Sequence, residues 1–198
     1  TIRPDLERLI AMLKAVPGVE DIALSTNGVR LPGMVQSLVA AGLDRVNISI
    51  DSLRPERITQ IARRDLKFDP IASLRSALDA GLDPVKFNMV VMRGINDDEI
   101  ADFARITLDH PLHVRFIELM PVGEMAGLTF EHIVPSTEVL ERAAAAVGSL
   151  EPAAGPAKGN GPARYYRAAG APGTIGVITP MSHTYCDTCN RVRLTADG

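Results

Sequence analysis

The stretch RVNISID, residues 45–51, alternates apolar and polar side chains. In an extended strand this alternation places Val46, Ile48 and Ile50 on one face and the polar residues between them on the other. A central parallel strand is normally covered on both faces and is apolar along its whole length. A polar face on such a strand must therefore look into a space that holds water or a ligand.

A second strand-like stretch, VKFNMVVM at residues 85–92, repeats the pattern with Lys86 and Asn88. Either stretch alone is about as well explained by an edge strand with one solvated face. Two such alternating strands in succession, both within strand–helix units, favour a barrel whose lumen holds a polar ligand. Ligand sites in such folds gather at the carboxyl ends of the strands, where the segments STNG, SIDSL and ELMPVG lie.

The rest of the first 120 residues alternates strands with helices. Strand-like segments precede and follow these two, at residues 19–28 and 113–120, and helical spacing marks residues 5–16, 35–42, 54–64, 69–81 and 97–108. Asn96 with Glu99 three residues later resembles a capping box for the last of these helices. Regular alternation predicts right-handed crossovers and a parallel sheet, hence an α/β fold.

The alternation breaks beyond Met120. We expect a helix over residues 136–147, a flexible connector in the Gly- and Pro-rich residues 151–163, and two short strands at 164–168 and 174–179. The two strands would form a hairpin-like extension beside the sheet.

Composition narrows the class of protein. The chain has 198 residues, 46% of them hydrophobic, which suffices for one sizeable core, and its net charge of -3 argues against a general nucleic-acid binder. No apolar run approaches the roughly 18 residues that span a bilayer. No signal peptide is visible, and two cysteines are too few for a secreted disulfide framework, so we expect a cytoplasmic protein.

Both cysteines, Cys186 and Cys189, lie in the final stretch TYCDTCNRVRLTADG, residues 184–198. A thioredoxin-type pair should precede a helix after an early strand, which does not fit this position. A structural zinc site needs four ligands, and His183, more often an ordinary surface histidine, would bring the total only to three. Free thiols and an iron–sulfur site both stay open, the latter needing further thiolates from outside this chain. Beside the pair, Arg191 and Arg193 share one side of an extended segment and suit recognition of phosphate or a purine edge.

The cysteine stretch resembles the cluster motif of the GTP 3',8-cyclases, radical S-adenosylmethionine enzymes of molybdenum cofactor biosynthesis. EDIALSTNG, RVNISIDSL, VVMRGINDDEI, VRFIELMPVG and ARYYR are similar to the same family, in the same order. The resemblance implies a partial radical-SAM TIM-like βα barrel over residues 1–120 and a C-terminal extension over residues 121–198 that carries an auxiliary 4Fe–4S site. It also implies an internal fragment, without the N-terminal cluster loop and the C-terminal end.

The chemistry implied by the resemblance uses two 4Fe–4S clusters. The first, whose ligands lie outside this chain, cleaves S-adenosylmethionine with an electron from a donor, and the resulting radical abstracts hydrogen from C3' of GTP. Attack on C8 gives (8S)-3',8-cyclo-7,8-dihydroguanosine 5'-triphosphate, which passes to cyclic pyranopterin monophosphate synthase. The second cluster binds the guanine. A homodimer is also expected of this family, and no membrane or nucleic-acid partner.

The resemblance also assigns residues to ligands. Cys186 and Cys189 match two ligands of the second cluster, and Ser49 and Met120 match positions on S-adenosylmethionine. The residues expected at GTP are Ser25 (commonly threonine in the family), Lys86, Arg115, Arg191 and Arg193. Arg115 and Met120 are five residues apart, so both reach a ligand only if their strand bends or ends near Glu118. Asn27, Asn47 and Asp51 are expected to support the mouth of the site through hydrogen bonds to strand-end loops.

Two other interpretations stay open. One is another radical-SAM enzyme with an auxiliary cluster, such as a peptide-modifying enzyme, although a peptide substrate would not require the two arginines. The other is a non-enzymatic nucleotide- or metal-binding module, which would bind GTP or zinc without turning over S-adenosylmethionine. This chain lacks the radical-generating cysteines, so we predict that it is inactive alone.

Overall fold

The computed structural model describes the chain except for residues 1–2, 67, 122–127, 159–160, 184–191 and 196. Its helices and strands, in chain order, are α1 (Leu6–Lys14), β1 (Ala23–Thr26), α2 (Val35–Ala40), β2 (Arg45–Ser49), α3 (Pro55–Ala62), α4 (Pro70–Asp79), β3 (Val85–Val91), α5 (Ile100–Asp109), β4 (His113–Glu118), α6 (Ser136–Val147), β5 (Leu150–Ala153), β6 (Arg164–Ala168) and β7 (Thr174–Ile178). Short 3-10 turns are η1 (Leu31–Gly33), η2 (Asp97–Glu99) and η3 (Phe130–His132).

The strands form one seven-stranded sheet in the order β1-β2-β3-β4-β7-β6-β5. Strands β1 to β4 and β7 are parallel, whereas β6 and β5 are antiparallel additions at one end. The alternation of strands and helices therefore predicts the parallel sheet correctly. The open, mixed α/β arrangement agrees with a partial radical-SAM barrel.

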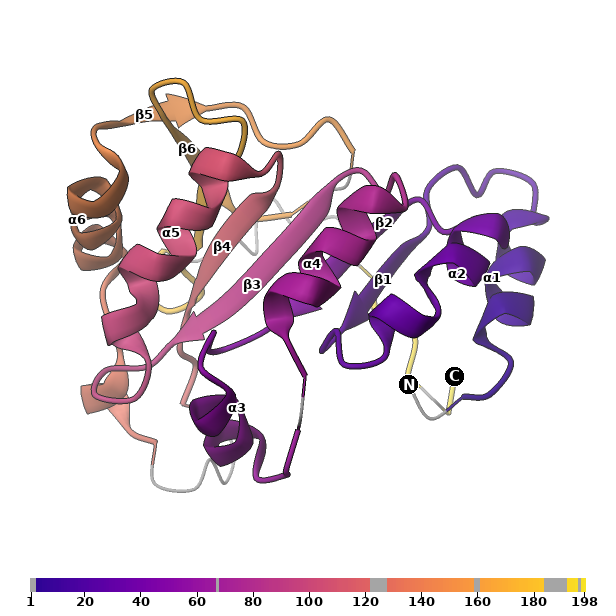
Figure 1. The fold of residues 1–198 in the computed structure, drawn as a ribbon, viewed down its shortest axis with the longest axis horizontal. Coiled ribbons are helices and arrows are strands. Elements are labelled where there is room, and N and C mark those ends of the chain that lie inside the picture. The colour runs from indigo at the N-terminus through magenta and orange to yellow at the C-terminus, as the bar shows by residue number, and fades with distance from the viewer. Residues whose placement is uncertain (1–2, 67, 122–127, 159–160, 184–191, 196) are drawn as a thin grey trace.

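Helices cover one face of this sheet. In Figure 1, α4 and α5 lie over β3 and β4, with α1 and α2 beside β1. The core forms where they pack, and its centre is a trio of buried rings: Phe87 and Phe103 lie 5.6 Å apart, and Phe103 and Phe116 lie 6.4 Å apart, between ring centroids. Helical and strand periodicity together thus place the apolar side of the alternating strands against the helices.

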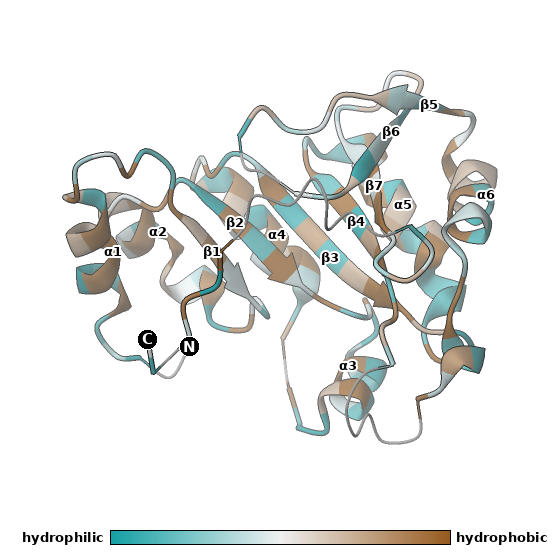
Figure 2. Cartoon of the chain, turned by 180° about the vertical axis from the view of Figure 1, so that it is seen from behind, coloured by the Kyte–Doolittle hydropathy of each residue, from teal (hydrophilic) through white to brown (hydrophobic). Residues whose placement is uncertain are grey.

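The opposite face of the sheet, called the open face below, carries no helix in the described part of the chain (Figure 2). Figure 2 shows β2, β3 and β4 from this side without a helix in front of them, and hydrophilic residues alternate with hydrophobic ones along them. The polar residues of RVNISID lie on this face, because Val46 and Ile48 are fully buried on the other. Ser49 is exposed on this face and Asn47 and Asp51 are half-buried, whereas Lys86 and Arg115 on the same face are buried.

Local signals explain where elements begin and end. Asp69 caps α4, since its carboxylate accepts a hydrogen bond from the backbone N–H of Ile71, 2.8 Å away. Pro70 occupies the first turn, where a missing N–H costs nothing. Gly81 follows the end of α4 with a φ of 77°, the left-handed conformation that glycine adopts without strain.

Three expectations need correction. The capping box is wrong: the Asn96 amide binds the backbone of Met92, Val90 and Asp51, and Glu99 is buried against α3. The connector is not structureless throughout, because Leu150–Ala153 pairs with β6. The C-terminal strands β6 and β7 do pair as an antiparallel hairpin, but the hairpin does not lie beside the sheet, since β7 also pairs with β4 and so continues it.

No helix in the described part of the chain is long and apolar enough to span a membrane.

Candidate functional site

Two rows of paired residues run across the strands on the open face. Because paired positions on adjacent strands project to the same side, each row forms one line of side chains. The first row is Ser25, Asn47, Lys86, His113 and Thr174. The second row is Ser49, Asn88, Arg115, Gly176 and Tyr165.

Arg115 joins the two rows. Its side chain is buried, and its Nε donates to Asn88 Oδ1 at 2.7 Å while Nη2 donates to Asn47 Oδ1 at 3.2 Å. Asn47 in turn donates to Ser25 Oγ at 3.3 Å. This chain of hydrogen bonds fixes the guanidinium in one orientation across four strands. Two of the residues expected at GTP, Ser25 and Arg115, are thereby connected.

Lys86 pairs with Asn47 on the neighbouring strand in the first row, and only 3% of its surface is exposed. Burial, together with the positive charges of Arg115 and Arg45, lowers the pKa of Lys86 to about 8, while Asp21 acts in the opposite direction. A cation in such surroundings is stabilised by any anion that reaches it. Lys86 and Arg115 therefore suit a strongly negative ligand on the open face.

His113 stands beside Lys86 in the same row. Burial is the main cause that lowers the pKa of His113 to about 4, and the neighbouring Lys86 charge adds to it. Its Nδ1 lies 2.7 Å from Thr174 Oγ1, within hydrogen-bond distance. The imidazole is therefore neutral at physiological pH and adds no positive charge to the site.

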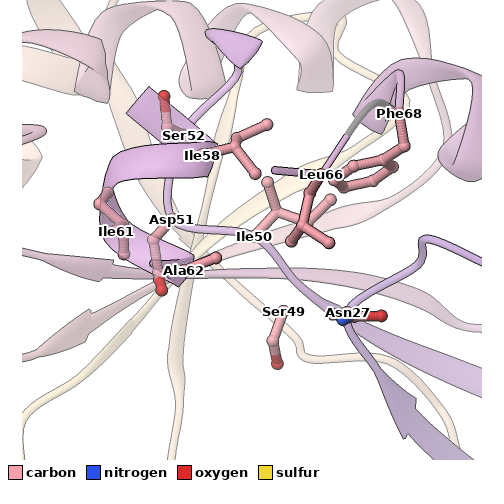
Figure 3. A pocket seen from close by; sticks show the side chains of 10 residues that line it. All are labelled: Asn27, Ser49, Ile50, Asp51, Ser52, Ile58, Ile61, Ala62, Leu66 and Phe68. Carbon is pink, nitrogen blue, oxygen red and sulfur yellow. The ribbon is translucent and has the colours of Figure 1, made fainter. Parts of the chain in front are cut away.

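A pocket of about 230 Å³ opens at the carboxyl ends of β1 and β2 (Figure 3). Ser49, Asp51 and Asn27 bring polar groups to it from the strand ends, and α3 with the segment after it supplies apolar walls. Its lining residues are Asn27, Ser49, Ile50, Asp51, Ser52, Ile58, Ile61, Ala62, Leu66 and Phe68. The apolar wall was missed from the sequence, although Ile58 and Ile61 at helical spacing in PERITQIA were the available signal.

Two of the three residues expected to support the mouth do so. Asp51 Oδ1 accepts from the backbone N–H of Val90 at 2.8 Å, which ties the ends of β2 and β3 together, and burial raises the pKa of its carboxyl. Asn27 Oδ1 accepts from Val29 N at 3.3 Å in the loop after β1. For Asn47 the expectation is wrong, because its amide binds side chains within the sheet face.

A buried carboxylate behind the pocket was not recognised in the sequence. Glu99 accepts hydrogen bonds from Ser52 Oγ and from the backbone N–H of Leu53, both at 2.7 Å, and pairs with Arg57 at 2.5 Å. Its side chain is 1% exposed. Glu99 thus holds the turn after β2, and α3 with it, against the start of α5. No sequence pattern marks such a contact, because its partners lie more than 40 residues away.

Comparison with known families gives two matches that together cover almost the whole chain. The model of the radical SAM superfamily matches residues 1–106, and that of Molybdenum Cofactor Synthesis C matches residues 112–198. The chain belongs to the radical SAM superfamily.

Relatives within the superfamily share one name. Proteins named GTP 3',8-cyclase from Pelotomaculum thermopropionicum, Heliobacterium modesticaldum and Moorella thermoacetica are each 48% identical over 197 residues. Each alignment covers 100% of this chain and 60% of the relative. The chain therefore spans about three fifths of the length of these proteins.

The residues expected at S-adenosylmethionine lie at one edge of this radical-SAM sheet. Ser49 is the last residue of β2 and is exposed in the pocket, and Met120 follows the end of β4 with 42% of its surface exposed. Strand β4 ends at Glu118, as the placement of both Arg115 and Met120 at ligands requires. Parallel strands bring these carboxyl ends to the same edge of the sheet.

The cysteine motif lies outside the described residues, as do Cys186, Cys189 and Arg191. The described residues on either side, His183 and Arg193, are exposed. Glu118 holds the segment that leads into the motif: its carboxylate accepts from the backbone N–H groups of Met181 and Ser182, at 2.8 and 2.9 Å, and from the Ser182 hydroxyl.

The described residues contain no group of three or more His, Cys, Asp or Glu side chains that could hold a metal ion. By donor chemistry, two thiols at C-x-x-C spacing fit an iron–sulfur cluster in part, and its remaining ligands must come from outside this chain.

Proposed function

We propose that the protein containing this chain is a GTP 3',8-cyclase, which converts GTP to (8S)-3',8-cyclo-7,8-dihydroguanosine 5'-triphosphate in molybdenum cofactor biosynthesis. The 48% identity along the entire chain to proteins of that name supports the assignment. The match of residues 112–198 to Molybdenum Cofactor Synthesis C supports the same pathway.

The structural observation that carries the proposal is the pair of buried cations on the open face. Lys86 offers a compact ammonium charge and Arg115 a planar, oriented guanidinium, and both suit a triphosphate. Ser25 extends the same hydrogen-bonded row with a hydroxyl. GTP would thus lie across the sheet face, with Arg191 and Arg193 contacting it from the C-terminal segment.

S-adenosylmethionine would lie at the strand ends, contacted by Ser49 and Met120. When bound beside a 4Fe–4S cluster, it supplies the radical that removes hydrogen from the ribose of GTP. The chain's own residues hold the triphosphate, and the apolar wall of the pocket excludes water from the reacting groups.

Cys186 and Cys189 would ligate a second 4Fe–4S cluster, in the C-terminal extension over residues 121–198. The proposal also includes an electron donor, transfer of the product to cyclic pyranopterin monophosphate synthase, a homodimer and a cytoplasmic location.

The test uses protein produced from the complete gene and reconstituted anaerobically with iron and sulfide. We expect about eight irons per chain, the sum of two four-iron clusters. Incubation with GTP, S-adenosylmethionine and a reductant should yield 5'-deoxyadenosine and the cyclised nucleotide, and the control without GTP should yield no cyclised nucleotide.

About four irons, or radical chemistry indifferent to GTP, would instead indicate a different radical-SAM enzyme. Binding of GTP or zinc without any cleavage of S-adenosylmethionine would indicate a binding module.

A further inference from the structure

Tyr165, from the RYYRA segment of β6, faces Arg115 across a glycine. Tyr165 pairs with Gly176 of β7, and Gly176 pairs with Arg115 of β4, so the three share one register row. The two neighbours of Gly176 therefore project to the same side and can approach each other only because no side chain stands between them.

The fit around Gly176 is tight. A Cβ built there would lie 3.0 Å from Tyr165 Cε1 and 3.1 Å from Arg115 Cγ. On its other side the ring meets Gly155, where a Cβ would lie 2.9 Å from Cδ2 and Cε2. His113 packs against the same ring in a T-shaped arrangement, with 5.7 Å between ring centroids. Two glycines and a histidine thus hold the phenol in one place.

The phenol also interacts with the guanidinium. Burial raises the pKa of Tyr165, and the charge of Arg115 and a hydrogen bond from its side chain act in the opposite direction. Arg115 is therefore held by the amides of Asn47 and Asn88 on one side and by Tyr165 on the other. The partners come from three strands, of which β6 is an antiparallel addition to the parallel sheet.

We propose that Tyr165 is a positioning residue for nucleotide binding: across the gap at Gly176 it orients the Arg115 guanidinium toward the triphosphate of GTP. The inference rests on the proposed function and extends it. It gives the C-terminal hairpin a role in the substrate site that is separate from the cysteine motif.

The test measures the Kd for GTP by calorimetry, anaerobically, on the reconstituted full-length protein. Tyr165→Phe keeps the ring and removes the hydroxyl, and we expect Kd to rise about 3- to 10-fold, the effect of one lost hydrogen bond. The Kd for S-adenosylmethionine should stay unchanged. Tyr166→Phe is the matched control, because Tyr166 packs on the opposite, core side of the same strand.

A double-mutant cycle separates positioning from general structure. In an Arg115→Gln background, Tyr165→Phe should change the Kd for GTP by less than about twofold, because the phenol would act only through the guanidinium. Equal effects in both backgrounds would overturn the proposal, as would an unchanged Kd in the single variant.

Gly176→Ala provides a second route, since it inserts a methyl group between the Tyr165 ring and the aliphatic part of the Arg115 side chain without changing either residue. We expect it to weaken GTP binding at least as much as Tyr165→Phe, and wild-type affinity in a folded Gly176→Ala protein would contradict the inference. Wild-type protein that does not bind GTP would instead refute the proposed function, so the two failures are distinguishable.

Discussion

Lys86 shows how one residue takes its chemistry from its neighbours. In solution a lysine keeps its proton to about pH 10, but burial beside Arg115 and Arg45 lowers the pKa of Lys86 to about 8. The sequence indicates a polar residue on the open face, and the lowered pKa follows only from the surrounding structure. Its consequence is a site whose charge changes close to physiological pH.

We predict that GTP affinity falls as pH rises through about 8. The ammonium loses its proton above its folded pKa, and with it the attraction for the triphosphate, whereas a lysine with an ordinary pKa would sustain binding to about pH 10. Bound GTP raises the pKa of Lys86, so binding near pH 8 should be accompanied by proton uptake.

Calorimetry in buffers of different ionisation enthalpy, on the full-length protein between about pH 7 and pH 10, measures both effects. Lys86→Met is the control: its affinity should be weaker throughout and should lack the step near pH 8. The same step in Lys86→Met would show that another group is responsible.

At the scale of elements, α3 depends on a contact made by another helix. The helix has only eight residues, too few for stability by itself, yet it forms a wall of the pocket. Glu99 anchors it through Ser52, Leu53 and Arg57. The element thus follows its sequence signal, and its position follows from a buried carboxylate of η2.

We predict that Glu99→Ala destabilises the protein by about 1–3 kcal/mol, the usual cost of leaving buried hydrogen-bond donors without a partner, here the Ser52 hydroxyl and the Leu53 N–H. Backbone amides of α3 should exchange faster, because the helix loses its attachment. Denaturant unfolding and hydrogen exchange measure the two effects.

Asp98→Ala is the matched control. Asp98 pairs with Arg54 and Arg57 beside Glu99, but its side chain is 50% exposed, so its loss should cost less than about 1 kcal/mol. Equal effects of the two substitutions would show that burial does not govern this contact.

At the scale of the whole molecule, one continuous sheet joins the segments matched by the two families. Strand β7 pairs with β4, so residues far apart in the sequence share one open face. The first family match ends at residue 106 and the second begins at residue 112, just before β4. The division into residues 1–120 and 121–198 remains a prediction, although no interruption of the sheet marks it in the described part of the chain.

We predict that the 198-residue chain by itself forms no cyclised GTP. It contains two cysteines, too few thiolates to complete even one four-iron cluster. Anaerobic reconstitution should give fewer than four irons per chain, and incubation with GTP, S-adenosylmethionine and a reductant should give no product. The protein from the complete gene is the positive control, and product from the isolated chain would disprove the prediction.

The sequence alone determined the alternation of strands and helices, the parallel sheet and the existence of a polar face. These properties depend on the periodic spacing of apolar and polar residues within short segments, which can be read from the sequence alone. It also placed Ser49 and Lys86 on that face, because successive residues of a strand point to opposite faces and the apolar neighbours show which face is buried. Motif resemblance indicated a radical SAM protein, and the family comparison confirmed membership of that superfamily.

Only the tertiary structure decided how distant residues meet. Glu99 follows a capping-box pattern but binds α3, since a buried partner outweighs a local one when the chain folds. Tyr165 reaches Arg115 only because register places Gly176 between them. Such contacts join positions tens of residues apart, and their geometry comes from strand pairing and burial, which no local pattern encodes.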